Sequence, residues 1–370
     1  MRNVIGLVDL HHDISLNFLT ENRSIASTQM LGRYCFIDFP LSNFSNSGIK
    51  KIGILIKEKP RSLFRHLGLK NPWAFNTKTG GITLLYNEKY ANDKVYNTDV
   101  NNLLENSWYL KDNYRAKYIV VAPAHLVMTI NYEDVVEKHI GSGAEITCVY
   151  KPNSKGRNEL LSSAIYELDG ERIISMKQNK GDKDIVNSSL STYVINYDVF
   201  VSLLEKAQNT SSLFALKDII KASLNTLKVF GYKYEGFVQA YDSLSAYLKN
   251  SLDLLNYENY ESLFKPNWPI YTRTYDTPPV IYGKEAKISN CFIANGSQIE
   301  GEVENSIIGR GCVIEKGAVV KNTILLANAK VCEGVSLNNV VIDKQAIIKY
   351  TKKLEGTTEN PIGIRQEDVA

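Results

Sequence analysis

The chain has 370 residues, too many for one ordinary compact core, so we expect a large domain and a smaller one. Its 43 basic and 40 acidic residues nearly balance, and the densest basic cluster, residues 349–353, is expected to be a solvated face rather than a nucleic-acid surface. The sequence contains neither a leader pattern nor an apolar stretch near the roughly eighteen residues of a membrane span, which predicts a cytoplasmic protein without a membrane partner.

Residues 1–255 alternate short apolar strands with helical patterns. The expected strands are residues 4–10, 51–56, 118–121, 145–150, 190–196 and 226–232, and the expected helices include residues 131–139, 199–208 and 213–223. This alternation predicts an α/β domain with a mostly parallel sheet covered by helices. Ligands of such sheets bind beyond the carboxyl ends of the strands. We therefore look for chemistry after Leu10, after Val121 and around Ala240.

The pattern changes after residues 256–279, a proline-rich stretch expected to be a linker. Apolar residues then recur every six positions, and the phase slips by one near residue 342. The repeated positions are Ile307, Val313, Val319, Leu325, Val331 and Leu337, followed by Ile342 and Ile348. This period predicts a left-handed parallel β-helix of hexapeptide repeats over residues 280–354. Residues 355–370 are expected to form a loose polar tail.

The five cysteines have neither CxxC spacing nor a histidine close by in the sequence. Such cysteines are typical of reduced, mostly buried thiols in a reducing compartment.

Residues 32–49 contain the most informative motif of the chain. They predict a short helix that begins at Asp38, has Pro40 in its first turn and ends at Gly48, with a strand over residues 51–56. The run Arg33-Tyr-Cys-Phe-Ile-Asp-Phe-Pro-Leu-Ser-Asn, continued by Asn-Ser-Gly-Ile49, resembles the corresponding segment of bacterial glucose-1-phosphate adenylyltransferases. The resemblance implies a nucleotidyltransferase-like (Rossmann-like) first domain.

The glycine-rich loop of that family is not retained. Catalytic members have Gly-Gly-x-Gly-x-Arg-Leu and then Thr-x-x-Arg-Ala-Lys-Pro, whereas residues 6–14 here keep only one glycine. Arg23 remains, and Ile25 occupies the lysine position. Backbone N–H groups of a glycine-rich turn bind the triphosphate, so we expect weak binding here. His11 and His12 raise the alternative of a metal site, but an ordinary polar loop is the preferred interpretation.

The two carboxylates that hold the metal ions in the family are also missing. The resemblance aligns Ala124, in Ala-Pro-Ala-His, with the first aspartate, and Ala240 with the second. Asp242 is the nearest substitute and would supply one ligand of two. No metal or other cofactor is therefore expected to be required, and Mg²⁺ would matter only if residual activity exists.

The sugar-phosphate and adenine motifs differ as well. Gln178 and Asn179 stand where the family has a glutamate and a lysine, and residues 96–99 replace its Gln-Gly-Thr-Ala. Lys177 or Lys180 would compensate only if the register slips.

These changes, on a retained scaffold, favour a non-catalytic regulatory subunit similar to the GlgD type of glycogen biosynthesis. The resemblance implies a catalytic paralogue as partner, in a heterotetramer, and Arg23 and Arg33 as candidates for binding a phosphorylated small-molecule effector. Three alternatives stay open: an active adenylyltransferase with relocated ligands, an acyltransferase of the hexapeptide class, and a freestanding sugar-nucleotide sensor. The acyltransferase needs a histidine at the β-helix, and all five histidines precede it.

Overall fold

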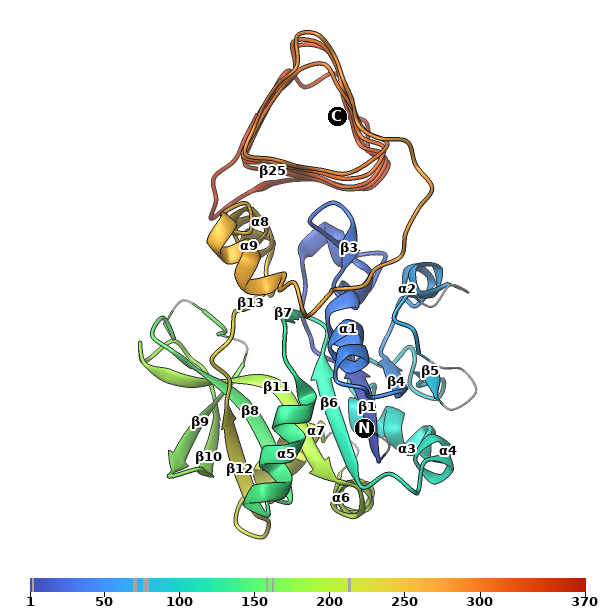
Figure 1. Cartoon of the computed structure of the whole chain (residues 1–370), viewed down its shortest axis with the longest axis vertical. Coiled ribbons are helices and arrows are strands. Elements are labelled where there is room, and N and C mark those ends of the chain that lie inside the picture. The colour runs from blue at the N-terminus through green and yellow to red at the C-terminus, as the bar shows by residue number, and fades with distance from the viewer. Residues whose placement is uncertain (2, 69–71, 76–79, 158, 162, 212–213) are drawn as a thin grey trace.

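The computed structural model describes residues 1, 3–68, 72–75, 80–157, 159–161, 163–211 and 214–370. An α/β domain is followed by a triangular β-helix, and the two are stacked along the long axis of the molecule (Figure 1).

The α/β domain is built on a nine-stranded sheet in the order β5-β4-β1-β6-β11-β8-β12-β10-β9. Its strands are β1 (Val4–Asp9), β4 (Lys51–Ile56), β5 (Gly81–Tyr86), β6 (Tyr118–Pro123), β8 (Ile146–Asn153), β9 (Ala164–Asp169), β10 (Arg172–Gln178), β11 (Val186–Asn196) and β12 (Val229–Lys233). Strands β5, β4, β1 and β6 are mutually parallel, and so are β8 and β12.

The sheet is mixed rather than mostly parallel, because β11 runs antiparallel to both β6 and β8. Strands β9 and β10 are joined by a tight turn at Gly170 (φ +58°), and strands joined this closely can only pair as an antiparallel hairpin. The alternation of strands and helices predicted the parallel half correctly but did not reveal this hairpin.

Helices cover both faces of the sheet. Their bounds are α1 (Asp38–Asn46), α2 (Arg61–Leu67), α3 (Asp99–Glu105), α4 (Ser107–Asp112), α5 (Tyr132–Ser142), α6 (Tyr197–Thr210), α7 (Leu216–Ala222), α8 (Leu244–Asp253) and α9 (Tyr257–Leu263). Apolar residues of α1, α2 and α5 pack on one face, and those of α3, α4, α6 and α7 pack on the other. Residue 213, where the sequence placed the start of α7, lies outside the described residues.

The motif at residues 32–49 folds as predicted. Helix α1 begins at Asp38, and the chain leaves it through Gly48, whose φ of +70° is a conformation that glycine adopts without strain. Strand β4 follows over the predicted residues.

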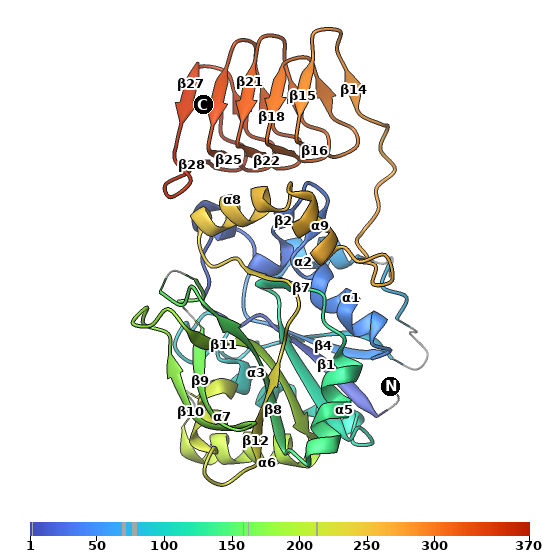
Figure 2. The ribbon, with the colours of Figure 1, turned by 60° about the vertical axis from the view of Figure 1, so that its left-hand side comes forward.

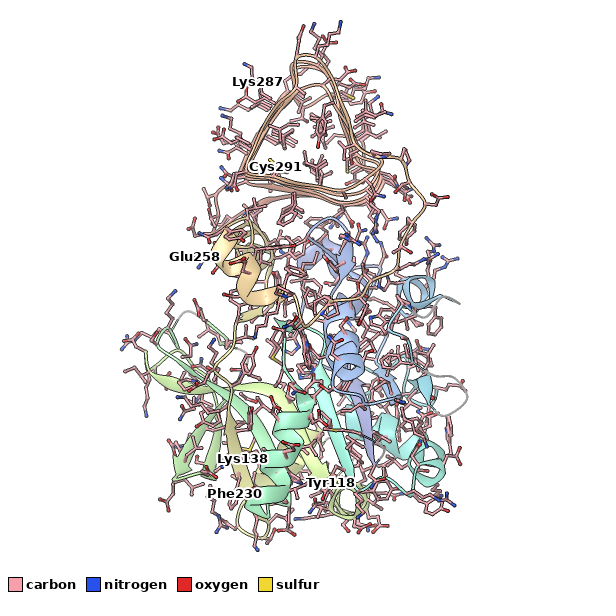
Figure 3. The ribbon with its side chains drawn as sticks, viewed as in Figure 1. Tyr118, Lys138, Phe230, Glu258, Lys287 and Cys291 are labelled. Atoms are coloured by element: carbon pink, nitrogen blue, oxygen red, sulfur yellow. The ribbon has the colours of Figure 1, made fainter. Side chains whose placement is uncertain are left out.

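The β-helix consists of three parallel sheets of five strands each (Figure 2). They are β14 (Ile281–Tyr282), β17 (Gln298–Ile299), β20 (Val313–Ile314), β23 (Lys330–Val331) and β26 (Ile347–Ile348); β15 (Lys287–Ser289), β18 (Glu302–Glu304), β21 (Val319–Lys321), β24 (Ser336–Asn338) and β27 (Lys353–Glu355); and β16 (Phe292–Ile293), β19 (Ile307–Ile308), β22 (Ile324–Leu325), β25 (Val340–Ile342) and β28 (Ile362–Ile364). Figure 3 shows Lys287 outside this solenoid and Cys291 toward its interior.

The register of the repeat differs from the prediction in its first coils. The inward column contains Ile308, Ile314 and Val320 rather than Ile307, Val313 and Val319. In the middle coils one side is a residue shorter, so Ile308, Leu325 and Ile342 recur every 17 positions and not every 18, whereas Ile293 and Ile308 are 15 residues apart. Counting strictly by six residues therefore misses the inward-facing position by one residue after each shorter side of the coil.

The outer face of the third sheet joins the two domains. Ile307, Ile324 and Val341 pack against α8, α9 and the β2–β3 hairpin (Gln29–Met30 and Tyr34–Cys35) in one apolar cluster. Part of the expected linker is thus a helix, α9. The expected tail is also structured, because β28 pairs with β25 and Val369 bridges to Ile347. Among the described helices, none combines the length and the apolar composition needed to cross a bilayer.

Candidate functional site

The loop after β1 turns its histidines inward. The Asp9 carboxylate accepts hydrogen bonds from the backbone N–H of His11 at 2.9 Å and lies 3.0 Å from its Nδ1, while Nδ1 of His12 lies 3.5 Å away. The ring of His12 packs against that of His125, with centroids 4.5 Å apart. The side chain of His11 is only 4% exposed. The expectation of an ordinary polar loop with diverging side chains is therefore wrong.

The electrostatics of this cluster oppose phosphate binding. Burial alone would raise the pKa of Asp9, but His11 and His12 lower it to about 2. Burial lowers the pKa values of His12 and His125. Asp99, at the first turn of α3, has its pKa raised to about 7 by burial and by the charge of Asp9. A buried carboxylate with imidazoles whose charged forms are disfavoured would repel a triphosphate.

Ala124 and Ala240 are brought to the same place by a short antiparallel ladder. Ala124 follows β6, and Ala240 ends β13 (Val238–Ala240), where it pairs with Leu126 of β7 (Leu126–Met128). Both side chains are methyl groups, which donate no electron pair to a cation. Within the described residues, no three His, Cys, Asp or Glu side chains are arranged to hold a metal ion. The residues at these two positions thus do not fit a magnesium ion.

Asn179 is a loop anchor. Its buried amide donates to the carbonyl of Gly156 at 2.9 Å and accepts from the backbone N–H of Gly181 at 3.0 Å. Ile25 is buried in the apolar cluster at the domain junction. Neither side chain replaces the function of the lysine that the resemblance places at its position.

Arg23 is not available to a ligand in this structure. Its guanidinium donates to both carboxylate oxygens of Asp343, at 2.8 and 2.7 Å, and to Gln366 at 2.8 Å. The prediction that Arg23 binds an effector is therefore not supported. The residue joins the α/β domain to the β-helix.

Arg33, by contrast, lines a cavity of about 380 Å³ at the domain junction. The walls come from the β2–β3 hairpin, α9, the segment before β14 and the first coils of the β-helix. The lining residues that carry polar groups are Arg33, Tyr34, Tyr260, Thr274, Tyr275, Asn295 and Arg310.

Arg310 is the unusual member of this set. It is 8% exposed, and its Nη atoms reach only the carbonyls of Arg33 and Arg273, at 3.3 and 3.4 Å. Its Nε has no hydrogen-bond partner, and no carboxylate lies within ion-pair distance, among the residues that the structure describes. Its guanidinium stacks 4.6 Å from the Tyr275 ring centre. A buried guanidinium whose Nε donates to none of the described atoms, beside Arg33, can bind an anion.

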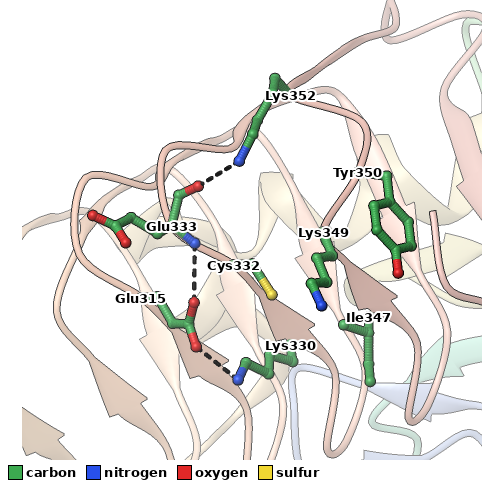
Figure 4. Close-up of a pocket in the computed structure, with 8 residues that line it drawn as sticks. All are labelled: Glu315, Lys330, Cys332, Glu333, Ile347, Lys349, Tyr350 and Lys352. Atoms are coloured by element: carbon green, nitrogen blue, oxygen red, sulfur yellow. Dashed lines mark hydrogen bonds and ion pairs between the residues drawn. The ribbon is translucent and has the colours of Figure 1, made fainter.

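A second hollow, of about 500 Å³, lies on the outside of the β-helix (Figure 4). One of its charge pairs is closed, because Lys330 pairs with Glu315 at 2.6 Å, and Lys352 donates to the backbone carbonyl of Glu333 at 3.0 Å. The neighbouring lysines 349, 352 and 353 are exposed, as the sequence predicted for this cluster.

Known proteins match both domains. The model of the nucleotidyl transferase family matches residues 16–233, and the model described as GlmU-like, C-terminal hexapeptide matches residues 280–357. A glucose-1-phosphate adenylyltransferase of Fervidobacterium nodosum is 30% identical over 354 residues, which cover 94% of the chain and 85% of that protein. The chain belongs to the glucose-1-phosphate adenylyltransferase family.

Other members of this family are similarly distant. Glucose-1-phosphate adenylyltransferases of Thermotoga maritima and Clostridium perfringens strain 13 are 30% and 28% identical, over 83% and 85% of the chain and 73% and 81% of their own length. The resemblance inferred from residues 32–49 is confirmed at the level of the family.

Two features of this family member were missed by the sequence reasoning. Arg310 lies between Gly309 and Gly311 in a repeat otherwise made of small and apolar residues, and that contrast was the available signal. The second is the imidazole of His66 beside Cys35, because the two residues are far apart in the chain and meet only through the fold.

Proposed function

We propose that the chain is a catalytically defective, regulatory subunit of glucose-1-phosphate adenylyltransferase. The observation that carries this proposal is that alanine occupies both positions, Ala124 and Ala240, where the family needs two metal-binding carboxylates; Ala240 pairs with Leu126, two residues after Ala124. A metal ion contributes several kcal/mol of transition-state stabilisation, and about 1.4 kcal/mol corresponds to a tenfold change in rate. The carboxylate-centred histidine cluster after β1 supports the same conclusion.

The partner in this proposal is a catalytic paralogue, with which the chain forms a mixed tetramer. The retained fold supports it, since both domains keep well-packed cores while five separate segments have changed. The regulatory subunit acts by favouring the active conformation of its partner, which requires different contact energies in the two states of the partner. It needs no metal ion of its own.

The cavity at the domain junction is the effector site in this proposal. Arg33 and Arg310 supply two positive charges, and three tyrosines and Asn295 supply neutral polar groups, a set suited to a phosphorylated small molecule. A ligand there would contact the hairpin, α9 and the β-helix together, so that binding would change the angle between the domains.

Coexpression with the catalytic paralogue of the same genome tests the main proposal. We expect the two chains to copurify and the complex to synthesise ADP-glucose, from ATP and glucose 1-phosphate with Mg²⁺, at a rate or effector response that the catalytic chain alone lacks. The chain alone should show no synthesis. Synthesis by the chain alone would favour the active-enzyme alternative, and failure to copurify would contradict the partner.

Calorimetric titration of the purified chain tests the effector site. Glucose 1-phosphate, ADP and inorganic phosphate serve as probes, and Arg310→Gln should weaken binding of any that binds by at least about tenfold, because one charge-assisted contact contributes about 1.5–3 kcal/mol. Arg115→Gln is the matched control, since Arg115 is exposed and stacks only on Tyr114. Equal affinities in both variants would place the ligand elsewhere.

A further inference from the structure

Cys35, His66 and Asp38 form a closed set of contacts beneath the β2–β3 hairpin. The sulfur of Cys35 lies 3.4 Å from Nδ1 of His66, and Nε2 of His66 lies 2.6 Å from Oδ1 of Asp38. The other carboxylate oxygen of Asp38 accepts the backbone N–H of Cys35 at 2.8 Å. The three side chains are therefore fixed in the order thiol, imidazole, carboxylate, although they come from β3, α2 and α1.

This arrangement distinguishes Cys35 from the other cysteines. Among the described residues, only Cys35 has an imidazole within hydrogen-bonding distance of its sulfur. Cys148 and Cys312 are buried, and burial raises the pKa of each thiol to about 12. The expectation that no cysteine has a histidine partner is therefore wrong for Cys35, since that expectation rested on distance along the sequence.

The charges around Cys35 favour an imidazolium next to the sulfur. Burial alone would lower the pKa of His66, but Cys35 and Asp38 raise it to about 11. A protonated His66 donates one N–H to Asp38 and the other to the sulfur. Lys344 and Arg310 are further cations that interact with Cys35, and the phenol of Tyr247 interacts with it as well. An electropositive site of this kind activates a thiol as a nucleophile.

We propose that Cys35 is a peroxide-reactive thiol, activated by His66 and Asp38, and a site of oxidation to sulfenic acid. The sulfur attacks one oxygen of hydrogen peroxide and forms an S–O bond while the O–O bond breaks. The leaving hydroxide takes a proton from the imidazolium of His66. One thiolate, one imidazolium and one peroxide thus give one sulfenic acid, one neutral imidazole and one water; the sulfur is oxidised and the peroxide is reduced.

The burial of the site favours a reagent of this size. Cys35 is 5% exposed and Asp38 is fully buried, and the Trp73 ring packs edge-on against His66 at 6.2 Å. Hydrogen peroxide is only slightly larger than water, whereas a peptide or a thioester could not reach the sulfur without opening the hairpin. The same set of side chains therefore supports oxidation in preference to acyl transfer.

The position of Cys35 connects its oxidation to the domain junction. Cys35 pairs with Gln29 in the β2–β3 ladder, and the side chain of Gln29 accepts the N–H of Ala327 in the β-helix at 3.2 Å. Arg33 and Tyr34, next to Cys35 in the chain, line the junction cavity. An added oxygen on a buried sulfur must displace neighbouring atoms, and the hairpin is the nearest element that can move.

Peroxide oxidation of the purified full-length chain tests the proposal: at each time point the peroxide is removed, the chain is unfolded in the presence of dimedone to trap sulfenic acid, and peptide mass spectrometry locates the label. We expect Cys35 to be labelled at least about tenfold faster than Cys332, a partly exposed cysteine without an imidazole partner. Cys35→Ser should remove the fast-reacting site. Labelling of Cys35 no faster than Cys332 would overturn the proposal.

The pH profile separates activation by His66 from simple exposure. For a free thiol, with a pKa of about 8.5, the thiolate population falls about 75-fold from pH 8 to pH 6. We expect the labelling rate of Cys35 to change less than about threefold over this range, and His66→Gln to restore the steep fall. If His66→Gln does not fold, the wild-type profile decides, because a steep profile would itself contradict the proposal. These measurements do not involve the catalytic paralogue, so their outcome is independent of the proposed regulatory function.

Discussion

The guanidinium of Arg23 donates two hydrogen bonds, of 2.8 and 2.7 Å, to the carboxylate of Asp343, which lies 320 residues later in the sequence. Both side chains are at most 3% exposed. This buried ion pair fixes the α/β domain to the β-helix beside Tyr247 of α8, at the border of the apolar junction cluster.

Replacing Arg23 by methionine should lower the free energy of unfolding by about 3–5 kcal/mol, because Asp343 would stay buried without its counter-charge. Denaturant unfolding monitored by circular dichroism measures the change. Arg365→Met is the control, since its pair with Glu21 is exposed and contributes at most about 1 kcal/mol. Equal losses in the two variants would contradict the role given to the buried pair.

Gly32→Ala should destabilise the chain by about 2–4 kcal/mol. Gly32 has a φ of +70°, and an added Cβ would lie 2.8 Å from the carbonyl oxygen of Ile308 in the β-helix. Gly170→Ala measures the cost of a positive φ without a steric clash, because Gly170 has a φ of +58° but no atom within 4 Å of the new Cβ. That variant should lose only about 1 kcal/mol. Thermal unfolding compares the stability of the two variants. A loss for Gly32→Ala no larger than that for Gly170→Ala would indicate that the residues at the domain junction can shift to accommodate the new Cβ.

Asp99 should make the chain less stable as the pH rises. The pKa of Asp99 is about 7 in the folded chain against 3.8 for an ordinary aspartate, so between these values the folded state holds a proton that the unfolded state has released. The wild type should therefore lose about 1.4 kcal/mol of unfolding free energy per pH unit relative to Asp99→Asn, from about pH 4 to pH 7.

The pKa of Asp9 is shifted in the opposite direction, so Asp9 makes the chain more stable as the pH rises. Its pKa of about 2 lies below the ordinary 3.8, so its contribution to stability is present above about pH 4 and is lost as the pH falls through about 2. Asp9→Asn should remove that loss at low pH. It should also flatten the slope due to Asp99, since the charge of Asp9 is one cause of the raised pKa. If the plots of unfolding free energy against pH were parallel for the wild type, Asp99→Asn and Asp9→Asn, the electrostatic coupling between Asp9 and Asp99 would be contradicted.

Returning both lost carboxylates should restore metal binding without restoring synthesis. Ala124→Asp with Ala240→Asp places one carboxylate on the β7–β13 ladder and the other two residues before it, and calorimetry should detect Mg²⁺ binding that the matched asparagine pair lacks. ADP-glucose synthesis should stay at least about a thousandfold below that of the catalytic paralogue, because the histidine cluster and Asn179 are unchanged. Synthesis at the paralogue's rate would show that the carboxylates alone were missing.

Patterns local in sequence predicted local structure well. The sequence around Asp38 and Gly48 predicted α1 to within two residues, and the apolar run of β4 predicted its bounds, since both depend on neighbours within a few residues. The six-residue period predicted the β-helix, but the shorter third side of each coil shifted Ile307 from the interior to the junction. The outward position of Ile307 could be recognised only from the structure, in which it packs against the apolar residues of the domain junction.

The site was less predictable, because its contacts join distant segments. The resemblance pointed to Ala124 and Ala240 as degenerate site positions, and the structure places Ala240 opposite Leu126, two residues after Ala124. Arg23 was predicted to bind an anionic effector because the sequence did not show that Asp343, in the other domain, is its ion-pair partner. His11 and His12 were expected to point apart, since nothing in the sequence showed that Asp9 would turn both inward.

The inward turn of His11 and His12 also bears on the history of the chain. Asp9 interacts with both His11 and His12, and His12 packs on His125, so returning Asp9 or His11 alone to a glycine or an arginine leaves a buried polar group without its partner. Each unmet group costs about 1–3 kcal/mol, a large part of the margin by which a protein stays folded. Reversal by single substitutions would pass through less stable intermediates, which makes the present arrangement hard to undo.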